Sequence, residues 1–255
     1  MNKKPFNRLK LRMHRNNMHD NWEKSAFLKK IASERLNERL LEVKKNFNLI
    51  LDLGSHSGEL SNLLKTSEKV KDTIQLEIAY NLAKIAKKSS FKTVVADEEN
   101  IPFKHNIFDG IFSSLSFHWI NEIPDLLIMI KKILKSNGLF LANFLGGKTL
   151  NELQKVLIYS ETKILGGSLP RVSPFIEIKD AGMLLQKAGF EMPVVDSEII
   201  TVTHRNIHHL FSDLRNMAEN SCLNIETIPL RRDVLAYAEK IYKNKYSRNN
   251  KIFST

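Results

Sequence analysis

Short apolar runs alternate with amphipathic segments over most of the chain. Apolar runs bounded by turn residues predict strands at residues 47–53, 73–77, 93–96, 108–113, 139–144 and 194–202. Segments with helical spacing separate them, as at 123–134, where Asn137-Gly138 would form the C-cap. This alternation predicts a Rossmann-like α/β fold: a doubly wound, mostly parallel sheet with helices on both faces.

Two further regions flank the predicted strands. Before the first strand, apolar residues from Trp22 to Val43 recur with helical spacing, which predicts one amphipathic helix or two short ones. After the fifth strand, helices are predicted from residue 147 onward and over 178–190. The chain therefore divides into an N-terminal arm and helix (1–45), an α/β core (46–146) and a C-terminal part with the sixth strand and further helices (147–255).

The turn after the first strand carries candidate chemistry. Asp52 lies near the strand end, and Gly54 and Gly58 follow four positions apart, with Ser55 to Ser57 between them. Gly54 lets the backbone turn and approach a ligand closely, and the free N–H groups at the start of the next helix face whatever lies over the strand end. The three-glycine spacing of the dinucleotide fingerprint is not met.

Acidic residues also end the second and third predicted strands. Glu77 lies about 20 residues beyond the glycines, where nucleotide-binding α/β folds place an acid that accepts hydrogen bonds from ribose hydroxyls. Its two oxygens suit the two hydroxyls of a vicinal diol. The alternative is a solvated glutamate at a strand end. Asp97 ends the third strand in the same way.

Taken together, these motifs resemble those of class I S-adenosylmethionine-dependent methyltransferases. The glycine loop is similar to their first motif, residues 97–103 (Asp-Glu-Glu-Asn-Ile-Pro-Phe) to their third, and Phe108-Asp109 to the opening of their fourth strand. The resemblance implies S-adenosylmethionine as the cofactor, with Asp97 facing the adenine amino group. The residues that it assigns to the cofactor are Asp52, Gly54, Ser55, His56, Gly58, Glu77, Ile78, Asp97, Glu98 and Ser114.

The second half of the chain narrows the resemblance. Residues 168–175, with Pro-Arg-Val-Ser-Pro-Phe, together with His118-Trp119 and 213–219, are similar to methyltransferase-fold assembly factors of mitochondrial respiratory complex I and their bacterial relatives. A more distant similarity is to the biotin-pathway methyltransferases that act on malonyl acyl-carrier protein. Methyl transfer to an unidentified substrate, a protein or an acyl carrier, is the main hypothesis. Arginine hydroxylation of a complex I subunit and a non-catalytic assembly role are the alternatives.

Three residues are candidates for the substrate side of the site. His118 follows the fourth strand, where the cofactor's methyl group should point, so it could act as a base or orient a substrate, and Trp119 could wall the pocket. The alternative is a packed aromatic residue beside a hydrogen-bonded histidine. Arg171, in a loop stiffened by Pro170 and Pro174, could bind a carboxylate or phosphate of a partner, or could pair with a nearby acid and hold the loop. The sequence names no catalytic residue.

The chain departs from the methyltransferase pattern at three places. The family usually has a further glycine between the two loop glycines, so Ser55 or His56 must adopt an unusual backbone angle or the loop must widen. Glu77 replaces the commoner aspartate, which moves the carboxylate by about 1.5 Å. The family closes its sheet with a hairpin whose last strand would begin at 251–253, where the chain stops, so a truncated chain with an open sheet edge is an expectation.

Composition excludes some classes of protein. The chain of 255 residues suits one domain with a small appendage, and no apolar run approaches the roughly 20 residues that span a bilayer. Cys222 is the single cysteine, so an internal disulfide is excluded, and no zinc spacing occurs. We therefore expect Cys222 to be a small buried hydrophobe, and no metal site. The expected compartment is reducing: the bacterial cytoplasm or, for a eukaryotic source, the mitochondrial matrix.

The net charge of +11 could indicate nucleic-acid binding. The basic residues are scattered, however, and no aromatic-plus-basic recognition motif accompanies them, so we do not expect nucleic acid as a partner. Residues 1–19 hold six Lys and Arg side chains and no acidic one. This pattern favours a solvated basic arm, with a mitochondrial transit peptide as the alternative.

Overall fold

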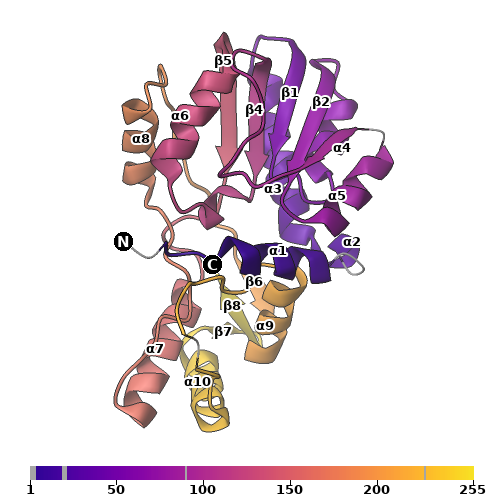
Figure 1. Ribbon diagram of the computed structural model, residues 1–255. Coiled ribbons are helices and arrows are strands. Elements are labelled where there is room, and N and C mark those ends of the chain that lie inside the picture. The colour runs from indigo at the N-terminus through magenta and orange to yellow at the C-terminus, as the bar shows by residue number, and fades with distance from the viewer. Residues whose placement is uncertain (1–3, 19–21, 90, 227) are drawn as a thin grey trace.

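A five-stranded parallel sheet forms the upper part of the molecule in Figure 1, a computed structural model that describes residues 4–18, 22–89, 91–226 and 228–255. The strand order is β3-β2-β1-β4-β5. The bounds are Phe47–Leu53 (β1), Val70–Glu77 (β2), Lys92–Val95 (β3), Phe108–Ser114 (β4) and Leu134–Asn143 (β5). Five of the predicted strands and the α/β class are therefore confirmed. The run of β1 is almost wholly apolar because a parallel sheet covered on both faces has no water-facing side.

Helices cover both faces of this sheet. On one face, Leu36 and Leu40 of α3 and Leu60 and Leu64 of α4 pack against Ile50 of β1. On the other face, buried leucines and isoleucines of α6 pack against β1 and β4, and leucines of α8 pack beside them. Each fully buried aliphatic side chain of this kind contributes roughly 1.5–3 kcal/mol relative to exposure. The helices that flank the sheet are Phe27–Glu42 (α3), Glu59–Lys65 (α4), Tyr80–Ala86 (α5), Ile123–Ile133 (α6) and Ile178–Lys187 (α8).

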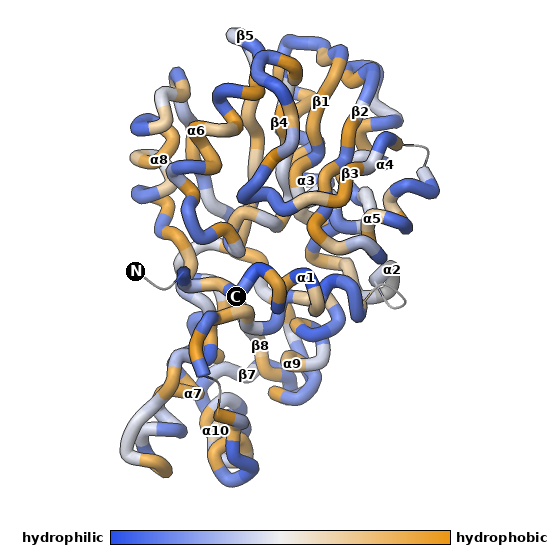
Figure 2. Tube along the Cα trace, viewed as in Figure 1, coloured by the Kyte–Doolittle hydropathy of each residue, from blue (hydrophilic) through white to orange (hydrophobic). Residues whose placement is uncertain are grey.

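Hydropathy follows this layering. Figure 2 shows apolar colour concentrated along β1 and β4 and hydrophilic colour on the outer turns. No helix within the described ranges is long and apolar enough to cross a membrane.

A smaller lobe lies below the sheet in Figure 1. It holds α7 (Asn151–Leu165), α9 (Ile207–Asn216) and α10 (Arg232–Lys245) around a second apolar cluster that includes Val156 and Tyr242. A three-stranded antiparallel sheet, in the order β6-β8-β7, completes the lobe. Its strands are Val202–His204 (β6), Ser247–Arg248 (β7) and Lys251–Ser254 (β8).

The predicted sixth strand at 194–202 is wrong. Residues 193–201 form no strand, and β6 begins only at Val202 and pairs with β8 in the lobe rather than with β5. Val194 and Ile199 are 88% and 68% exposed, so these apolar residues of the segment do not face a core. Pro193 adds a residue that cannot donate to a strand ladder. The predicted strand at 251–253 does form, as β8, but it too belongs to the small sheet.

The predicted C-cap at Asn137-Gly138 is also wrong. Helix α6 ends at Ile133, and both residues lie within β5. Leu134 already pairs with Phe108 of β4, and the register then shifts between Phe108 and Gly110. The chain therefore enters the sheet directly from the helix, and the Asn-Gly pair occupies the irregular part of the ladder.

The N-terminal segment forms helices rather than a solvated arm. Helix α1 (Arg8–Asn17) crosses the lower ends of the strands in Figure 1, and Asn7 caps it by accepting a hydrogen bond from the Lys10 N–H at 3.0 Å. Arg15 and Leu11 are each only 1% exposed, so the prediction of a solvated arm is wrong for the described residues; residues 1–3 and 19 lie outside them. The predicted amphipathic segment forms two helices, α2 (Trp22–Ser25) and α3.

Candidate functional site

The glycine loop after β1 approaches its neighbours closely. Gly54 has φ +74°, and a Cβ there would lie 2.2 Å from Oγ of Ser116, so only glycine fits. The unusual backbone angle that the sequence required falls on His56, with φ 50°. The His56 ring is fixed by a contact of 2.9 Å between Nδ1 and the Gly54 carbonyl, and by stacking on Trp22 with ring centroids 5.1 Å apart. The loop is thus held in one shape at the end of β1.

Glu77 lies at the end of β2 with no exposed surface. Its carboxylate accepts two backbone hydrogen bonds of 2.9 Å, from the N–H groups of His56 and Ala79. It also accepts hydrogen bonds from Nη1 of Arg15 at 3.2 and 3.3 Å. The two backbone donors orient both carboxylate oxygens, whatever third partner is present.

Asp97 and Glu98, just beyond the end of β3, bind Arg8, another arginine of α1. Nη2 of Arg8 donates to Asp97 at 2.6 Å and to Glu98, and Nη1 of Arg15 lies 3.3 Å from Glu98. Ser116 Oγ donates to Glu98 at 2.8 Å. Burial disfavours the charge of Glu98, but Arg8 and Arg15 outweigh it and lower the pKa of that carboxyl to about 2. Glu98 is therefore ionised at neutral pH.

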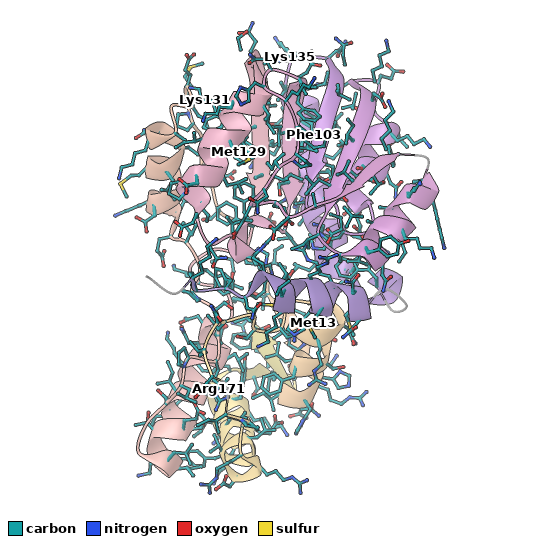
Figure 3. All side chains as sticks on the ribbon, in the orientation of Figure 1. Met13, Phe103, Met129, Lys131, Lys135 and Arg171 are labelled. Atoms are coloured by element: carbon teal, nitrogen blue, oxygen red, sulfur yellow. The ribbon has the colours of Figure 1, made fainter. Side chains whose placement is uncertain are left out.

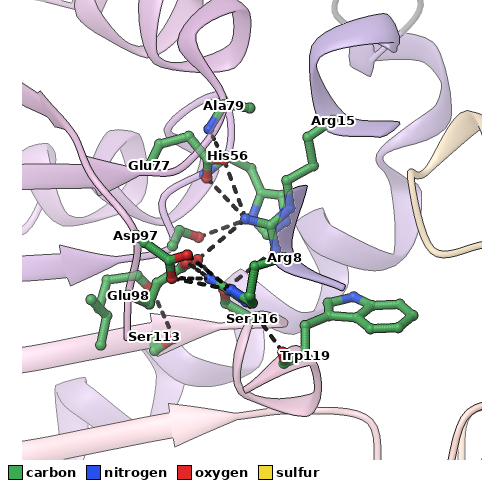
Figure 4. A network of polar contacts seen from close by, with 12 residues as sticks. Arg8, Arg15, His56, Glu77, Ala79, Asp97, Glu98, Ser113, Ser116 and Trp119 are labelled. Carbon is green, nitrogen blue, oxygen red and sulfur yellow. Dashed lines mark hydrogen bonds and ion pairs between the residues drawn. The ribbon is translucent and has the colours of Figure 1, made fainter. Parts of the chain in front are cut away.

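Two arginines of α1 thus occupy the acids that the sequence assigns to the cofactor, as Figure 4 shows. The sequence analysis missed both arginines. One signal was available: the first 19 residues carry basic groups only, while the ends of β2 and β3 carry acidic ones. Opposite charges on segments that the fold brings together could have predicted these ion pairs.

Asp52 lies beneath the glycine loop and is 1% exposed. Its Oδ2 accepts a hydrogen bond of 2.6 Å from Ser61, while its Oδ1 and the Ser55 Oγ have no partner within the described residues. Burial raises the pKa of Asp52 to about 6 and lowers the pKa of Lys29 to about 8. The Lys29 ammonium donates to the Ser114 carbonyl and lies 3.4 Å from the Gly54 carbonyl. These groups hold the loop from below.

The remaining predicted cofactor residues lie around the same loop. Gly58, with φ +95°, is the N-cap of α4, and Ile78 is buried in the apolar cluster with Trp22. Every residue of the predicted cofactor set therefore comes from the carboxyl ends of β1, β2, β3 and β4 or the turns that follow them.

His118 and Trp119 form a short turn, Phe117–Trp119, that follows β4. Both side chains contact Glu219, a residue that the sequence analysis did not single out: His118 Nε2 lies 2.8 Å and Trp119 Nε1 2.9 Å from its Oε2. Since 100 residues separate Trp119 from Glu219, no local pattern could have found the contact. Trp119 is thus packed and hydrogen-bonded, as the alternative interpretation expected.

Arg171 lies in the lower lobe beside α7 and α10, as Figure 3 shows. It donates to Glu161 at 3.0 and 2.6 Å and to the Ile228 carbonyl. This is the ion pair with a nearby acid that the alternative interpretation required. Phe175 of the same loop lies near His118, with ring centroids 6.3 Å apart.

The hydrogen-bonding groups of the site match those of S-adenosylmethionine. Glu77 offers two oriented oxygens for a diol, and Asp97, whose side chain is 26% exposed, offers an acceptor for an exocyclic amine. A cavity of about 110 Å³ lies beside Asp97 and is lined by α1 and the ends of β2 and β3. The space in front of Glu77 is occupied by the Arg15 side chain.

Comparisons with known proteins show the family and agree with the fold. A family model described as a methyltransferase domain matches residues 51–142, the sheet with its glycine loop. The fold is similar to that of the YcgJ protein of Bacillus subtilis, with a TM-score of 0.60 at 10% identity over 87% of this chain and 93% of that one. The chain belongs to the class I S-adenosylmethionine-dependent methyltransferase family.

Within the family, the chain is similar to proteins named mitochondrial arginine-hydroxylase NDUFAF5. It is 38% identical to that of Homo sapiens over 225 residues, which is 88% of this chain and 65% of the human protein. It is 34% identical to that of Danio rerio, over 89% of this chain and 71% of the fish protein. The malonyl-[acyl-carrier protein] O-methyltransferase of Gallionella capsiferriformans is more distant, at 28% identity over 77% of this chain and 69% of its own length.

Proposed function

We propose that this protein binds S-adenosylmethionine at the carboxyl ends of β1, β2 and β3. Glu77 accepts hydrogen bonds from the ribose hydroxyls, and Asp97 accepts one from the adenine amino group. The loop from Gly54 to Gly58 lies against the remainder of the cofactor. The observation that carries the proposal is the buried Glu77 carboxylate, which two backbone N–H groups hold at 2.9 Å. That carboxylate lies where nucleotide-binding α/β folds recognise a ribose.

Methyl transfer to a protein or an acyl-carrier substrate is the reaction that we propose. The bound cofactor supplies a methyl group on a positively charged sulfur. The chain itself supplies alignment, because holding a nucleophile and the methyl group together converts a bimolecular step into an effectively unimolecular one. The substrate then enters from the side of His118, beyond the end of β4.

Arginine hydroxylation is the second candidate. It is favoured by the relatives named arginine-hydroxylase, which match 88% to 90% of this chain. The site is also able to hold guanidinium groups, since its carboxylates bind those of Arg8 and Arg15. A role in respiratory complex I assembly, and residence in a mitochondrial matrix or a bacterial cytoplasm, are proposed on the same ground, the similarity to these relatives.

Two measurements test the proposal. Calorimetry with S-adenosylmethionine should show binding at one site, and the Glu77→Ala variant should bind more weakly while Asp72→Ala, an exposed change near the start of the same strand, should not. Absence of binding to the unchanged protein would overturn the proposal. Incubation with methyl-labelled cofactor and cell extract then separates the reactions: label on a protein or carrier supports methyl transfer, and an arginine that gains oxygen without label supports hydroxylation.

A further inference from the structure

The contact between His118 and Glu219 has the form of a histidine oriented by a carboxylate. Nε2 of His118 lies 2.8 Å from Oε2 of Glu219, and the two side chains are 1% and 8% exposed. Trp119 Nε1 donates to the same oxygen at 2.9 Å. The carboxylate therefore fixes the imidazole and the indole against each other.

The hydrogen atoms of this cluster can be assigned. An indole N–H only donates, so Glu219 accepts from Trp119. Burial disfavours the charge of Glu219, but His118 and, more weakly, Arg15 and Trp119 outweigh it and lower the pKa of that carboxyl. Glu219 is thus an ionised acceptor, and Nε2 of His118 carries the hydrogen between them. In a neutral imidazole, Nδ1 then holds a free lone pair.

Nδ1 is buried and has no hydrogen-bond partner within the described residues. A buried polar atom without a partner is uncommon in folded proteins and calls for an explanation. The chain offers a comparison. His204 also pairs with a carboxylate, Asp213, at 2.8 Å, but its second nitrogen lies 3.0 Å from the Ser254 hydroxyl, so both of its nitrogens are satisfied. His204 therefore has the pattern of a structural histidine, and His118 does not.

The position of His118 agrees with a role at the site. The turn that carries it begins directly after Ser116, which contacts both Glu98 and the Arg15 guanidinium. The carboxylate that contacts His118 is Glu219, which follows α9, and Arg15 of α1 acts in turn on that carboxylate. A ligand that replaced the Arg15 side chain would lie beside this turn.

We propose that Glu219 and Trp119 are positioning residues that hold His118 as the Nε2–H tautomer, so that Nδ1 accepts a proton from the substrate. The inference rests on the proposed methyl transfer. In that reaction the substrate nucleophile forms a bond to the methyl carbon, the carbon–sulfur bond breaks with its electrons left on sulfur, and the proton of the nucleophile passes to Nδ1. The imidazolium that results is stabilised by the Glu219 carboxylate and releases the proton to water after the product leaves.

Nitrogen-15 NMR of histidine-labelled protein tests the tautomer without any substrate. The resonances of His118 are assigned by their loss in His118→Gln. In the neutral imidazole, Nε2 should be protonated and Nδ1 unprotonated, and Glu219→Ala should give a mixture of tautomers. The matched control is Asp213→Asn, which should change the spectrum of His204 alone. A hydrogen on Nδ1 in the unchanged protein would overturn the proposal.

Label transfer tests the proton-accepting role. His118→Gln should transfer methyl label to the substrate at least a hundredfold more slowly than the unchanged protein, with cofactor affinity by calorimetry within threefold. Asp213→Asn should retain the rate. Transfer by His118→Gln within twofold of the unchanged protein would overturn this role. Failure of the proposed function is a different result: the unchanged protein would bind no S-adenosylmethionine, whatever the tautomer of His118.

Discussion

The guanidinium of Arg15 lies 3.2 Å from the carboxylate of Glu77, and both side chains are buried. One residue comes from the first helix of the chain and the other from the second strand. A cofactor that used Glu77 to hold a ribose would meet Arg15 in the same place. A ligand bound at Glu77 would have to displace the Arg15 guanidinium and supply hydrogen-bond donors to the buried carboxylate in its place, because a buried carboxylate left without a partner is costly.

Hydrogen exchange should therefore report movement of α1. We expect S-adenosylmethionine to speed amide exchange over residues 8–17, because Arg8 and Arg15 lose their carboxylate partners. It should slow exchange over residues 54–58 and at Ala79, where the ligand covers the loop. Slower exchange in both regions would contradict displacement and would mean that α1 closes over the ligand.

Glu77→Ala should weaken S-adenosylmethionine binding by roughly 1–3 kcal/mol, because charge-assisted hydrogen bonds are lost. Calorimetry measures the affinity, and a melting curve confirms that the variant folds, since Arg15 keeps Glu98 at 3.3 Å. Asp72→Ala is the control on the same strand, where the side chain is exposed. Unchanged affinity in a folded Glu77→Ala variant would remove Glu77 from the site.

Asp52 should give the stability of the protein a distinct pH dependence. Burial raises its pKa from 3.8 to about 6, so the folded state binds more protons than the unfolded state between these values. Its contribution to stability is fully present below about pH 4 and is lost as the pH rises through 6. The loss is about 3 kcal/mol.

Denaturant titrations at several pH values check this expectation. Asp52→Asn cannot ionise, so between pH 4 and 7 it should lose about 3 kcal/mol less than the unchanged protein, the loss assigned to Asp52. The variant also changes the hydrogen bond to Ser61, which alters stability at every pH. The test is therefore how the free energy of unfolding changes with pH, not its value at one pH. Parallel curves for the two proteins would contradict the shifted pKa.

The sequence predicted the parts of the fold in which burial produces a continuous run of apolar residues. Strands such as β1 and β4 are buried on both faces, so their apolar runs are long and their positions were found. The segment 194–202 also looks like a strand, but Val194 and Ile199 are exposed in the structure. Local pattern does not reveal whether a core is available.

Some residues of the candidate site could be predicted from the sequence and others could not. Asp52, Glu77 and Asp97 were found because each lies at or next to a strand end, and the carboxyl ends of parallel strands meet at one edge of a sheet. Arg15 and Glu219 were missed because their partners lie 62 and 101 residues away in the chain. Arg15 was placed in a solvated arm since charged residues are almost never buried unless they are paired, and its partners were not yet known to be close.

Arg171 gives the last prediction. Its guanidinium makes two hydrogen bonds to Glu161, whose side chain is 1% exposed, against 18% for Arg171. Removal of the arginine leaves a buried carboxylate without its cation, so Arg171→Ala should lower the free energy of unfolding by roughly 2–4 kcal/mol and the melting temperature with it. The cofactor pocket is built by other elements, so the affinity for S-adenosylmethionine should stay within twofold.

Glu161→Gln is the matched variant. If the pair is structural, the double variant should be destabilised by clearly less than the sum of the two single losses, because each single change already breaks the same interaction. A substrate role would give another pattern: Arg171→Ala would slow label transfer to the substrate at unchanged melting temperature, while Glu161→Gln would not. Arg171 lies in the lobe that holds α7 and α10, on the opposite side of α1 from the sheet (Figure 3), and Glu161 belongs to α7. We therefore expect the first pattern.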